Sequence, residues 1–232
     1  AWELSSYDDF LKGTPSGLSI GRNGRLALAP KPAEVFASSQ GAIWAMARAA
    51  DGTLYLATGH AGKLFRIAPG GKGEVIFAAP EPEIFALALD AQGRLYAATS
   101  PNGKIYRIEN GRASEYFKPW TRYIWSLAAA PDGTLYAGTG DQGRIYRITG
   151  QGQGEIYFDT EQLHVTSLGL DAKGRLLAGT EPNGLLYRVD AKDRAFALYD
   201  SDLPEIRAIL PNADGSVYVA ALGGSLVRSQ SA

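Results

Sequence analysis

Short apolar segments separated by glycine turns fill this chain, and one unit built from them recurs five times. Each unit opens with a segment in which bulky and small side chains alternate: Ile43-Trp44-Ala45-Met46-Ala47, Ile84-Phe85-Ala86-Leu87-Ala88, Ile124-Trp125-Ser126-Leu127-Ala128, Val165-Thr166-Ser167-Leu168-Gly169 and Ile206-Arg207-Ala208-Ile209-Leu210. Consecutive units are offset by 41, 40, 41 and 41 residues. A period of this length is typical of propellers, solenoids and other arrays, so it limits the fold before any single residue is interpreted.

The opening segment of each unit has one bulky side and one small side. Residues two apart lie on the same side of a strand, so Trp44 faces away from Ala45 and the same holds in later units. One bulky and one small face suit flat sheets that stack against neighbours on both sides. We therefore expect the bulky column of Trp44, Phe85 and Trp125 to pack in the core rather than to form a stacking site for a sugar.

Each unit continues with three more predicted strands, and the turns between them are rich in glycine. Pairs such as Asp-Gly reach the positive-φ conformations that tight hairpins require, and they stand at 51–52, 92–93, 132–133, 173–174 and 214–215. Second strands are predicted at 54–58, 95–99, 135–139, 176–180 and 217–220, and third strands at 64–67, 105–108, 145–148, 186–189 and 226–228. Fourth strands are predicted at 75–77, 115–117, 156–158 and 196–199. No segment of helical length keeps a 3.6-residue apolar period, so the unit is read as a four-stranded antiparallel propeller blade.

The predicted fold is therefore an all-β, six-bladed β-propeller forming a single domain over 1–232. Full blades are expected at 43–83, 84–123, 124–164 and 165–205, and a last blade at 206–232 that has only three strands. An irregular segment at 1–42 contains further predicted strands at 18–20, 26–28 and 34–36. An unpaired strand edge is an aggregation hazard, so we expect N-terminal strands to close the ring against the last blade. Five blades result if 34–36 only completes the last unit, and an array that is longer or closes on another copy is a third alternative.

Composition excludes several classes of function. The chain has 23 basic and 24 acidic residues, a net charge of −1, which gives no electrostatic footprint for nucleic acid or an anionic membrane. There are no cysteines, so disulfides, thiolate metal sites and cysteine nucleophiles are excluded. No apolar run of about 18 residues is present, so membrane insertion is not expected. The first residues lack the basic and apolar segments of an export signal, so we expect any such signal to be missing from this sequence.

One segment carries a resemblance to a known family: Val165-Thr166-Ser167-Leu168-Gly169-Leu170-Asp171-Ala172-Lys173-Gly174-Arg175-Leu176-Leu177-Ala178-Gly179-Thr180-Glu181-Pro182-Asn183-Gly184-Leu185-Leu186-Tyr187-Arg188. It resembles the repeat of two-component-regulator-type propellers. It is also similar to large exported bacterial repeat proteins of the WD40 or NHL kind, in which such units follow a segment like Ser5-Ser6-Tyr7-Asp8-Asp9-Phe10. The resemblance implies the propeller fold and a secreted or periplasmic location. It says little about chemistry, because the shared positions are turns and core. The Trp-Asp signature of WD40 blades does not repeat here, and this chain has no membrane or kinase segment of the sensor group.

A polar binding patch is expected at the channel mouth, the end of the propeller channel where the innermost strands begin. The residues that precede these strands do not repeat: Ala42, Glu83, Tyr123, His164 and Glu205. Positions that repeat serve the scaffold, whereas divergent positions in a shared location are free to bind a ligand. Arg207 interrupts the bulky column, Glu181 and Asn183 vary on a neighbouring turn, and Trp120 lies outside the repeat. The alternative interpretation of this patch is a solvated rim with internal ion pairs.

Metal and nucleophile chemistry have weaker support in the sequence. Glu83 and Glu205, with Glu81 or Asp202 nearby, have the oxygen ligands that suit Ca²⁺, but no dense acidic cluster is present. His60 occupies a turn position that holds Pro101 in the next unit, so it is read as a surface residue. A hydrolase triad would need a histidine beside an activated serine, and nothing in the sequence marks such a serine. We therefore assign no catalytic residue, metal or cofactor.

The expected function is a non-catalytic binding or interaction module, with a protein, small-molecule or carbohydrate ligand at the channel mouth. One alternative is a metal-dependent hydrolase or lyase with a site in the central channel. A second is a purely structural protein that assembles through its repeats. We expect a monomer, with self-association only through unpaired strand edges, and no nucleic-acid partner. Fold by itself does not choose between these functions.

Overall fold

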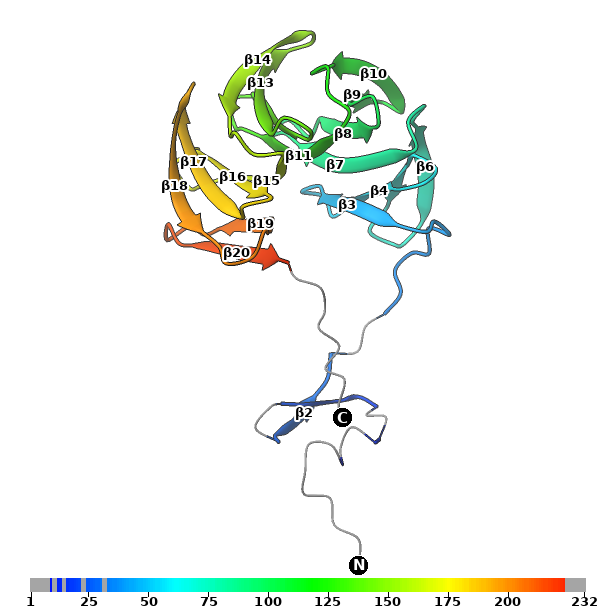
Figure 1. The fold of residues 1–232 in the computed structure, drawn as a ribbon. Coiled ribbons are helices and arrows are strands. Elements are labelled where there is room, and N and C mark those ends of the chain that lie inside the picture. Colours follow the sequence, from blue (N-terminus) through cyan, green and yellow to red (C-terminus); the bar gives the residue numbers. More distant parts are fainter. Residues whose placement is uncertain (1–8, 10–11, 14–15, 22–23, 31–32, 224–232) are drawn as a thin grey trace, which may run out of the picture. The chain divides into compact units, whose positions relative to one another are not determined.

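The computed structural model of this chain consists of β-strands joined by short turns (Figure 1). It describes residues 9, 12–13, 16–21, 24–30 and 33–223, in which twenty strands are assigned. Two compact units are present, 1–37 and 38–232. Within the described residues, no helix has the length and apolar character needed to span a membrane.

Four complete blades follow one another in the larger unit, each an antiparallel sheet whose strands pair in chain order. Blade 1 comprises β3 (Ile43–Arg48), β4 (Leu54–Thr58), β5 (Lys63–Ile67) and β6 (Gly73–Ala78). Blade 2 comprises β7 (Glu83–Leu89), β8 (Leu95–Ser100), β9 (Lys104–Glu109) and β10 (Arg112–Phe117). Blade 3 comprises β11 (Ile124–Ala129), β12 (Leu135–Thr139), β13 (Arg144–Gly150) and β14 (Gln153–Asp159). Blade 4 comprises β15 (His164–Leu170), β16 (Leu176–Glu181), β17 (Leu185–Ala191) and β18 (Arg194–Asp200), and blade 5 is the hairpin of β19 (Glu205–Pro211) and β20 (Val217–Leu222).

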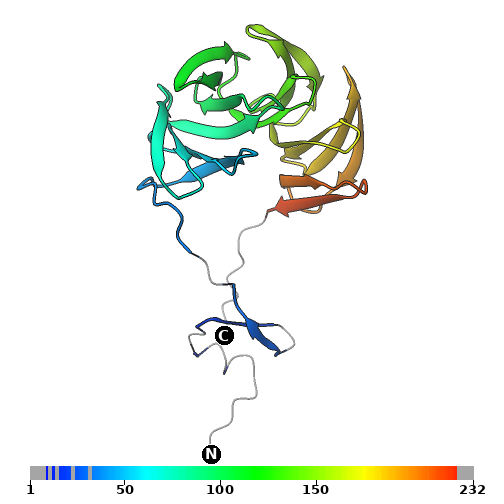
Figure 2. The same cartoon turned by 180° about the vertical axis from the view of Figure 1, so that it is seen from behind.

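These blades are arranged as in a propeller. The inner strands β3, β7, β11, β15 and β19 are in contact in that order, and Figures 1 and 2 show the sheets fanning outwards from them. The predicted fold class, an all-β propeller of four-stranded antiparallel blades, is confirmed. The described residues form six sheets, two of which are two-stranded, and this is consistent with the predicted count of six blades. The predicted third strand of the last blade, at 226–228, lies outside the described residues.

The smaller unit contains the predicted strands β1 (Leu18–Ile20) and β2 (Leu26–Leu28), which pair as an antiparallel hairpin. The strand predicted at 34–36 is wrong, because these residues are assigned to no strand. A strand is defined by ladder hydrogen bonds, and its expected partner at 226–228 lies outside the described residues. Most of the segment 5–10, which resembles the N-terminal segment of exported repeat proteins, also lies outside the described residues. The single domain over 1–232 and the closure of the ring by N-terminal strands both stay predictions.

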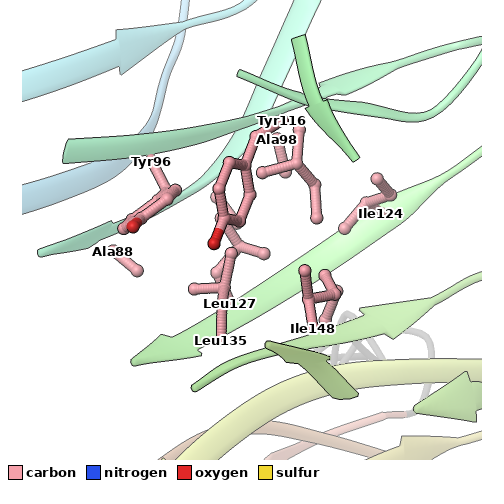
Figure 3. Packing of buried hydrophobic residues seen from close by; sticks show 11 residues of the cluster. Ala88, Tyr96, Ala98, Tyr116, Ile124, Leu127, Leu135 and Ile148 are labelled. Atoms are coloured by element: carbon pink, nitrogen blue, oxygen red, sulfur yellow. The ribbon is translucent and has the colours of Figure 1, made fainter. Parts of the chain in front are cut away.

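The core lies between neighbouring blades. Figure 3 shows the cluster between blades 2 and 3, where Tyr96 and Ile124 pack with small residues such as Ala98. The first apolar residue of each inner strand from blade 2 onwards is fully buried: Ile84, Ile124, Val165 and Ile206. The small alternate positions, such as Ala86 and Ala88, are buried with them. The predicted alternation is therefore correct, and its small side is the one that packs between blades.

The bulky column is not part of this core, which corrects the sequence-based expectation. Every inner strand has a register shift directly after its first apolar residue, for example between Ile84 and Ala86. A bulge of this kind inserts one extra residue, bends the strand and changes the direction of a side chain. The extra residues are Trp44, Phe85, Trp125, Thr166 and Arg207. Alternation along the sequence could not show this, because a bulge interrupts the period of two.

Candidate functional site

A cavity of about 370 Å³ lies at the channel mouth and is lined by bulge residues from four blades together with one carboxylate. Its lining consists of Trp44, Glu83, Phe85, Trp125 and Arg207. The rings of Trp44 and Phe85 are 5.5 Å apart between centroids, and those of Phe85 and Trp125 are 4.6 Å apart. Tilted contacts at these distances are favourable aromatic packing. The aromatic column therefore forms a wall of a cavity, although the sequence predicted that it would be buried between sheets.

Two tryptophans of this wall have the same hydrogen-bonding arrangement. The indole Nε1–H of Trp44 donates to Oε2 of Glu83 at 2.6 Å, and that of Trp125 donates to Nδ1 of His164 at 3.1 Å. In both cases the acceptor is the first residue of the inner strand of the next blade. Each bond therefore ties two neighbouring blades together and fixes the indole plane.

Glycines make room for both arrangements. A Cβ on Gly59 would collide with Nε1 of Trp44 and with Glu83, and a Cβ on Gly140 would collide with Trp125 and His164. Blades 2 and 4 have Phe85 and Thr166 at the bulge, and the matching loop positions are Ser100 and Glu181. Blades 1 and 3 thus share a tryptophan at the bulge, a glycine in the loop and an acceptor at the start of the next blade. The spacing between these three residues is the same in both cases. This co-occurrence is the sequence signal that would have identified the cavity wall.

His60 belongs to this site, although the sequence analysis assigned it to plain surface. Its backbone N–H and its ring Nδ1 both contact Oε1 of Glu83, at 3.1 and 3.2 Å. A carboxylate accepts hydrogen bonds, so Nδ1 of His60 bears the proton and Nε2 is the basic nitrogen. The side chain is 70% exposed, whereas that of Glu83 is 18% exposed. No repeat signal marked His60, because the equivalent positions are occupied by unrelated residues.

His164 has the opposite tautomer. The indole N–H of Trp125 is a donor only, so Nδ1 of His164 must be the acceptor and Nε2 bears the proton. The backbone N–H of Asp141 also points to Nδ1, at 3.4 Å. Glu181 is the register partner of His164 across β15 and β16. The two histidines of this protein are thus each one hydrogen bond away from a residue of the cavity wall.

Tyr123 and Arg207 complete the channel mouth. Tyr123 stacks on Trp125 at 5.0 Å with an interplanar angle of 9°, and Arg122 lies over the tyrosine ring at 5.1 Å. Arg207 lines the cavity and forms an ion pair of 3.3 Å with Glu205, two residues earlier on β19. Five of the predicted site residues, Glu83, Tyr123, His164, Glu205 and Arg207, are therefore located at or beside the cavity.

Two other predicted site residues, Trp120 and Asn183, are not brought to the cavity wall. Trp120 is 86% exposed beneath the ammonium group of Lys118, and it lines a separate depression beside Phe117 and Tyr146. Asn183 lies in another depression between the end of blade 4 and the start of blade 5. These two residues are loop positions, whose placement relative to the channel the repeat could not predict.

The carboxylates that the sequence suggested as metal ligands do not lie together as one coordination site. Glu81 is buried, accepts a hydrogen bond from the Tyr106 hydroxyl at 3.3 Å and pairs with Lys104 at 3.3 Å. The hydrogen bond from Lys104 to this carboxylate raises the pKa of the lysine, and burial raises the pKa of Tyr106. Among the described residues, no three histidine or acidic side chains converge as metal ligands would. The residues therefore do not fit a bound metal, and we derive no step through one.

Comparison with solved structures shows the fold of this chain. It superimposes on a catalytically inactive histidine-to-alanine variant of virginiamycin B lyase from Staphylococcus aureus with quinupristin, with a TM-score of 0.70, 18% identity, and coverage of 80% of this chain and 65% of that one. A putative gluconolactonase matches with a TM-score of 0.61 and 16% identity, covering 88% and 77% of the two chains. The calcium-binding protein regucalcin from Agrobacterium tumefaciens matches with a TM-score of 0.64 and 18% identity, covering 85% and 71%. The chain spans less than two thirds of the length of the virginiamycin B lyase variant. No protein-family model and no curated protein matches the sequence.

These neighbours confirm the propeller-like repeat fold that the sequence resemblance implied. They also correct the functional expectation. A non-catalytic binding module was expected, whereas the similar structures include proteins named as a lyase and a lactonase. The alternative of a hydrolase or lyase with a channel site fits this finding better.

Proposed function

We propose that this chain is a catalytic propeller that opens an ester or lactone at its channel mouth, by elimination or by hydrolysis. The observation that carries this proposal is the pair of contacts at Nδ1 of the two histidines, a carboxylate at His60 and an indole N–H at His164, from which opposite tautomers follow. The partners at Nδ1 leave His60 with a basic Nε2 and His164 with a protonated Nε2. A base and an acid that are separately fixed are what ester opening by proton transfer requires.

The proton balance can be written for both reactions. In elimination, Nε2 of His60 takes a proton from the carbon next to the one that bears the ester oxygen, and the electron pair of that C–H bond forms a C=C double bond. The carboxylate leaves with the electron pair of the broken C–O bond and accepts a hydrogen bond from Nε2–H of His164. In hydrolysis, His60 takes a proton from the water that attacks the carbonyl carbon, and Nε2–H of His164 donates its proton to the departing alkoxide oxygen. Glu83 orients His60 and stabilises the imidazolium that forms, as a carboxylate partner does in histidine-based catalysis.

The names of the structural neighbours supply the substrates for the test. Purified protein is incubated with quinupristin and, separately, with gluconolactone, and the products are analysed by mass spectrometry. Hydrolysis adds one water to the product, whereas ring-opening elimination leaves its mass unchanged. We expect turnover of at least one of the two compounds, and turnover of neither contradicts the proposal for this substrate class.

The two histidines are then tested by substitution with asparagine. His60 has a φ of +63°, a left-handed conformation that asparagine tolerates, and an asparagine at 164 can still accept the Trp125 indole bond. We expect His60→Asn and His164→Asn each to lower kcat/KM about 100-fold or more, the usual contribution of general acid–base catalysis. Asp193→Asn, at an exposed left-handed turn position with a φ of +56°, is the matched control and should keep full activity. Full activity in both histidine variants, with unchanged melting, would exclude these roles.

A further inference from the structure

The cavity wall presents aromatic ring surfaces whose polar edges are already bonded. The indole N–H groups of Trp44 and Trp125 are occupied by Glu83 and His164. Phe85, which lies between them, has no polar group. A ligand in this cavity therefore meets ring faces rather than hydrogen-bond donors. Trp44 is 39% exposed, a large value for a tryptophan that is held in place by a short hydrogen bond.

This wall is fixed in place before any ligand arrives. Each indole is held to the next blade, and Phe85 is in ring contact with both tryptophans. A stacking surface whose side chains are already ordered loses little conformational entropy when it binds a ring. A cavity of about 370 Å³ is within the range of small-molecule sites and accommodates one or two rings.

The two charged residues of the lining, Glu83 and Arg207, differ in how many of their polar atoms already form a hydrogen bond or ion pair within the protein. Both carboxylate oxygens of Glu83 accept hydrogen bonds, one from Trp44 and the other from the backbone and ring of His60. Among the described residues, Arg207 has one ion pair, from a terminal nitrogen to Glu205 at 3.3 Å, and its side chain is half-exposed. A guanidinium has five N–H donors in a planar fork that matches a carboxylate. Arg207 is therefore the residue of the wall best suited to pair with a charged group on the ligand, and that group must be an anion.

We propose that the cavity binds a planar ring that carries a carboxylate, with the ring on the aromatic wall and the carboxylate on Arg207. The inference rests on the proposed function, since it names the class of substrate or product that this same channel site takes. A ring-bearing ester that is opened at the channel mouth yields such a carboxylate. A cationic ligand is disfavoured, because Arg207 would repel it and Glu83 is already occupied.

A binding experiment tests this inference independently of catalysis. The full chain is titrated with 3-phenylpropanoate and with its neutral amide, 3-phenylpropanamide, and binding is followed by calorimetry and by tryptophan fluorescence. We expect the carboxylate to bind about tenfold or more tightly than the amide, because a charge-assisted pair with arginine is roughly twice as strong as a neutral hydrogen bond. Arg207→Gln should remove this preference by weakening the carboxylate about tenfold while leaving the amide unchanged. Arg48→Gln is the matched control, an exposed arginine on inner strand β3 that does not line the cavity.

The aromatic wall has its own variant. Trp44→Leu keeps an apolar side chain at an exposed position and should weaken both probes, because it removes the ring face that they share. Equal binding of carboxylate and amide, or no effect of Arg207→Gln, would overturn the role of Arg207. Failure of both probes to bind at millimolar concentration would overturn the site. Binding as expected without turnover of any ester would contradict the proposed function and leave the ligand site in place.

Discussion

Two indole nitrogens, those of Trp44 and Trp125, determine how the channel mouth is built. Each donates to a side chain of the next blade, and each needs a glycine beside it because any Cβ there would occupy the same space. A buried or half-buried indole N–H without a partner costs free energy, so the acceptors Glu83 and His164 stabilise the wall while they are themselves oriented by it.

Gly140→Ala tests this arrangement at the scale of one methyl group. The added Cβ would meet Nε1 of Trp125 and Nδ1 of His164, so the indole must move and its bond must lengthen. We expect a loss of about 1–3 kcal/mol of unfolding free energy, typical of overpacking, together with a shift in tryptophan emission. Gly70→Ala is the control, because a Cβ there meets nothing within 4 Å and no left-handed φ is involved. A Gly140→Ala protein that melts like the control would show that the indole bond is not tightly held.

Divergence from the repeat is the signal by which the sequence selects its candidate site residues, and their role in binding a ligand stays a prediction. Glu83, Tyr123, His164, Glu205 and Arg207 differ from their repeat equivalents, and the structure places all five at or beside the channel mouth. The aromatic wall was missed because Trp44, Phe85 and Trp125 look alike, and similarity was read as core. His60 was missed because its partner Glu83 is 23 residues away, a contact that only the folded chain reveals.

At the scale of elements, the turn after each inner strand contains an aspartate that accepts backbone hydrogen bonds, at one of two positions: Asp90 and Asp171 in blades 2 and 4, and Asp51, Asp132 and Asp214 two residues later in the other blades. Asp90 is buried and accepts hydrogen bonds from the backbone of Gln92 and Arg94, from the Tyr96 hydroxyl and from the Arg94 side chain. Burial by itself would raise the pKa of Asp90, but these bonds, led by the Arg94 side chain, outweigh it and lower the pKa below the ordinary value. The turn is therefore held by an ionised carboxylate.

Asp90→Asn removes this charge and replaces one acceptor oxygen by a donor. We expect a loss of about 2–3 kcal/mol near neutral pH, slightly less than for a fully buried pair, because Arg94 is partly exposed. Because the folded-state pKa lies below the unfolded value of about 3.9, the stabilisation is complete above that pH and is lost as pH falls through the folded pKa. The difference in urea midpoint between wild type and variant should therefore shrink below about pH 4. A difference that is constant down to pH 2 would contradict this origin.

Strand positions were the most predictable feature of this chain. Four strands per unit follow from β-branched and aromatic runs between glycine turns, and the assigned strands of blades 1 to 4 lie where the sequence placed them. The bulge in each inner strand was not predictable, because one extra residue leaves the apolar pattern readable while changing the direction of Trp44, Phe85 and Trp125. The strand expected at 34–36 failed because an apolar run becomes a strand only when another strand pairs with it.

At the scale of the whole molecule, the sheets that begin and end the series of blades differ from the others. Ile43 is 50% exposed, whereas its repeat equivalent Ile84 is 0% exposed. On the last blade, Leu210 and Tyr218 are exposed as well. Within the part of the larger unit that the structure describes, these two blade faces are therefore more exposed than the equivalent faces of the other blades.

A pair of substitutions measures this difference in solution. Ile84→Ala creates a cavity in a packed core and should cost about 2–5 kcal/mol. Ile43→Ala removes a side chain that is half in water, and on its observed exposure it should cost under about 1 kcal/mol. Chemical denaturation of both variants compares the two values directly. Equal costs would show that another part of the protein covers this face, as closure of the ring by N-terminal strands would require.

The tryptophan, glycine and acceptor of blades 1 and 3 mean that neighbouring blades are not interchangeable parts. A blade with a tryptophan at its bulge must be followed by a blade that begins with a hydrogen-bond acceptor. Blades 2 and 4 have Phe85 and Thr166 at the bulge, which have no indole N–H and need no such acceptor. The modular step of this protein is therefore two blades long. An engineer who lengthens or shortens the array should keep each tryptophan blade together with the blade that follows it, since that blade supplies the acceptor of the indole N–H.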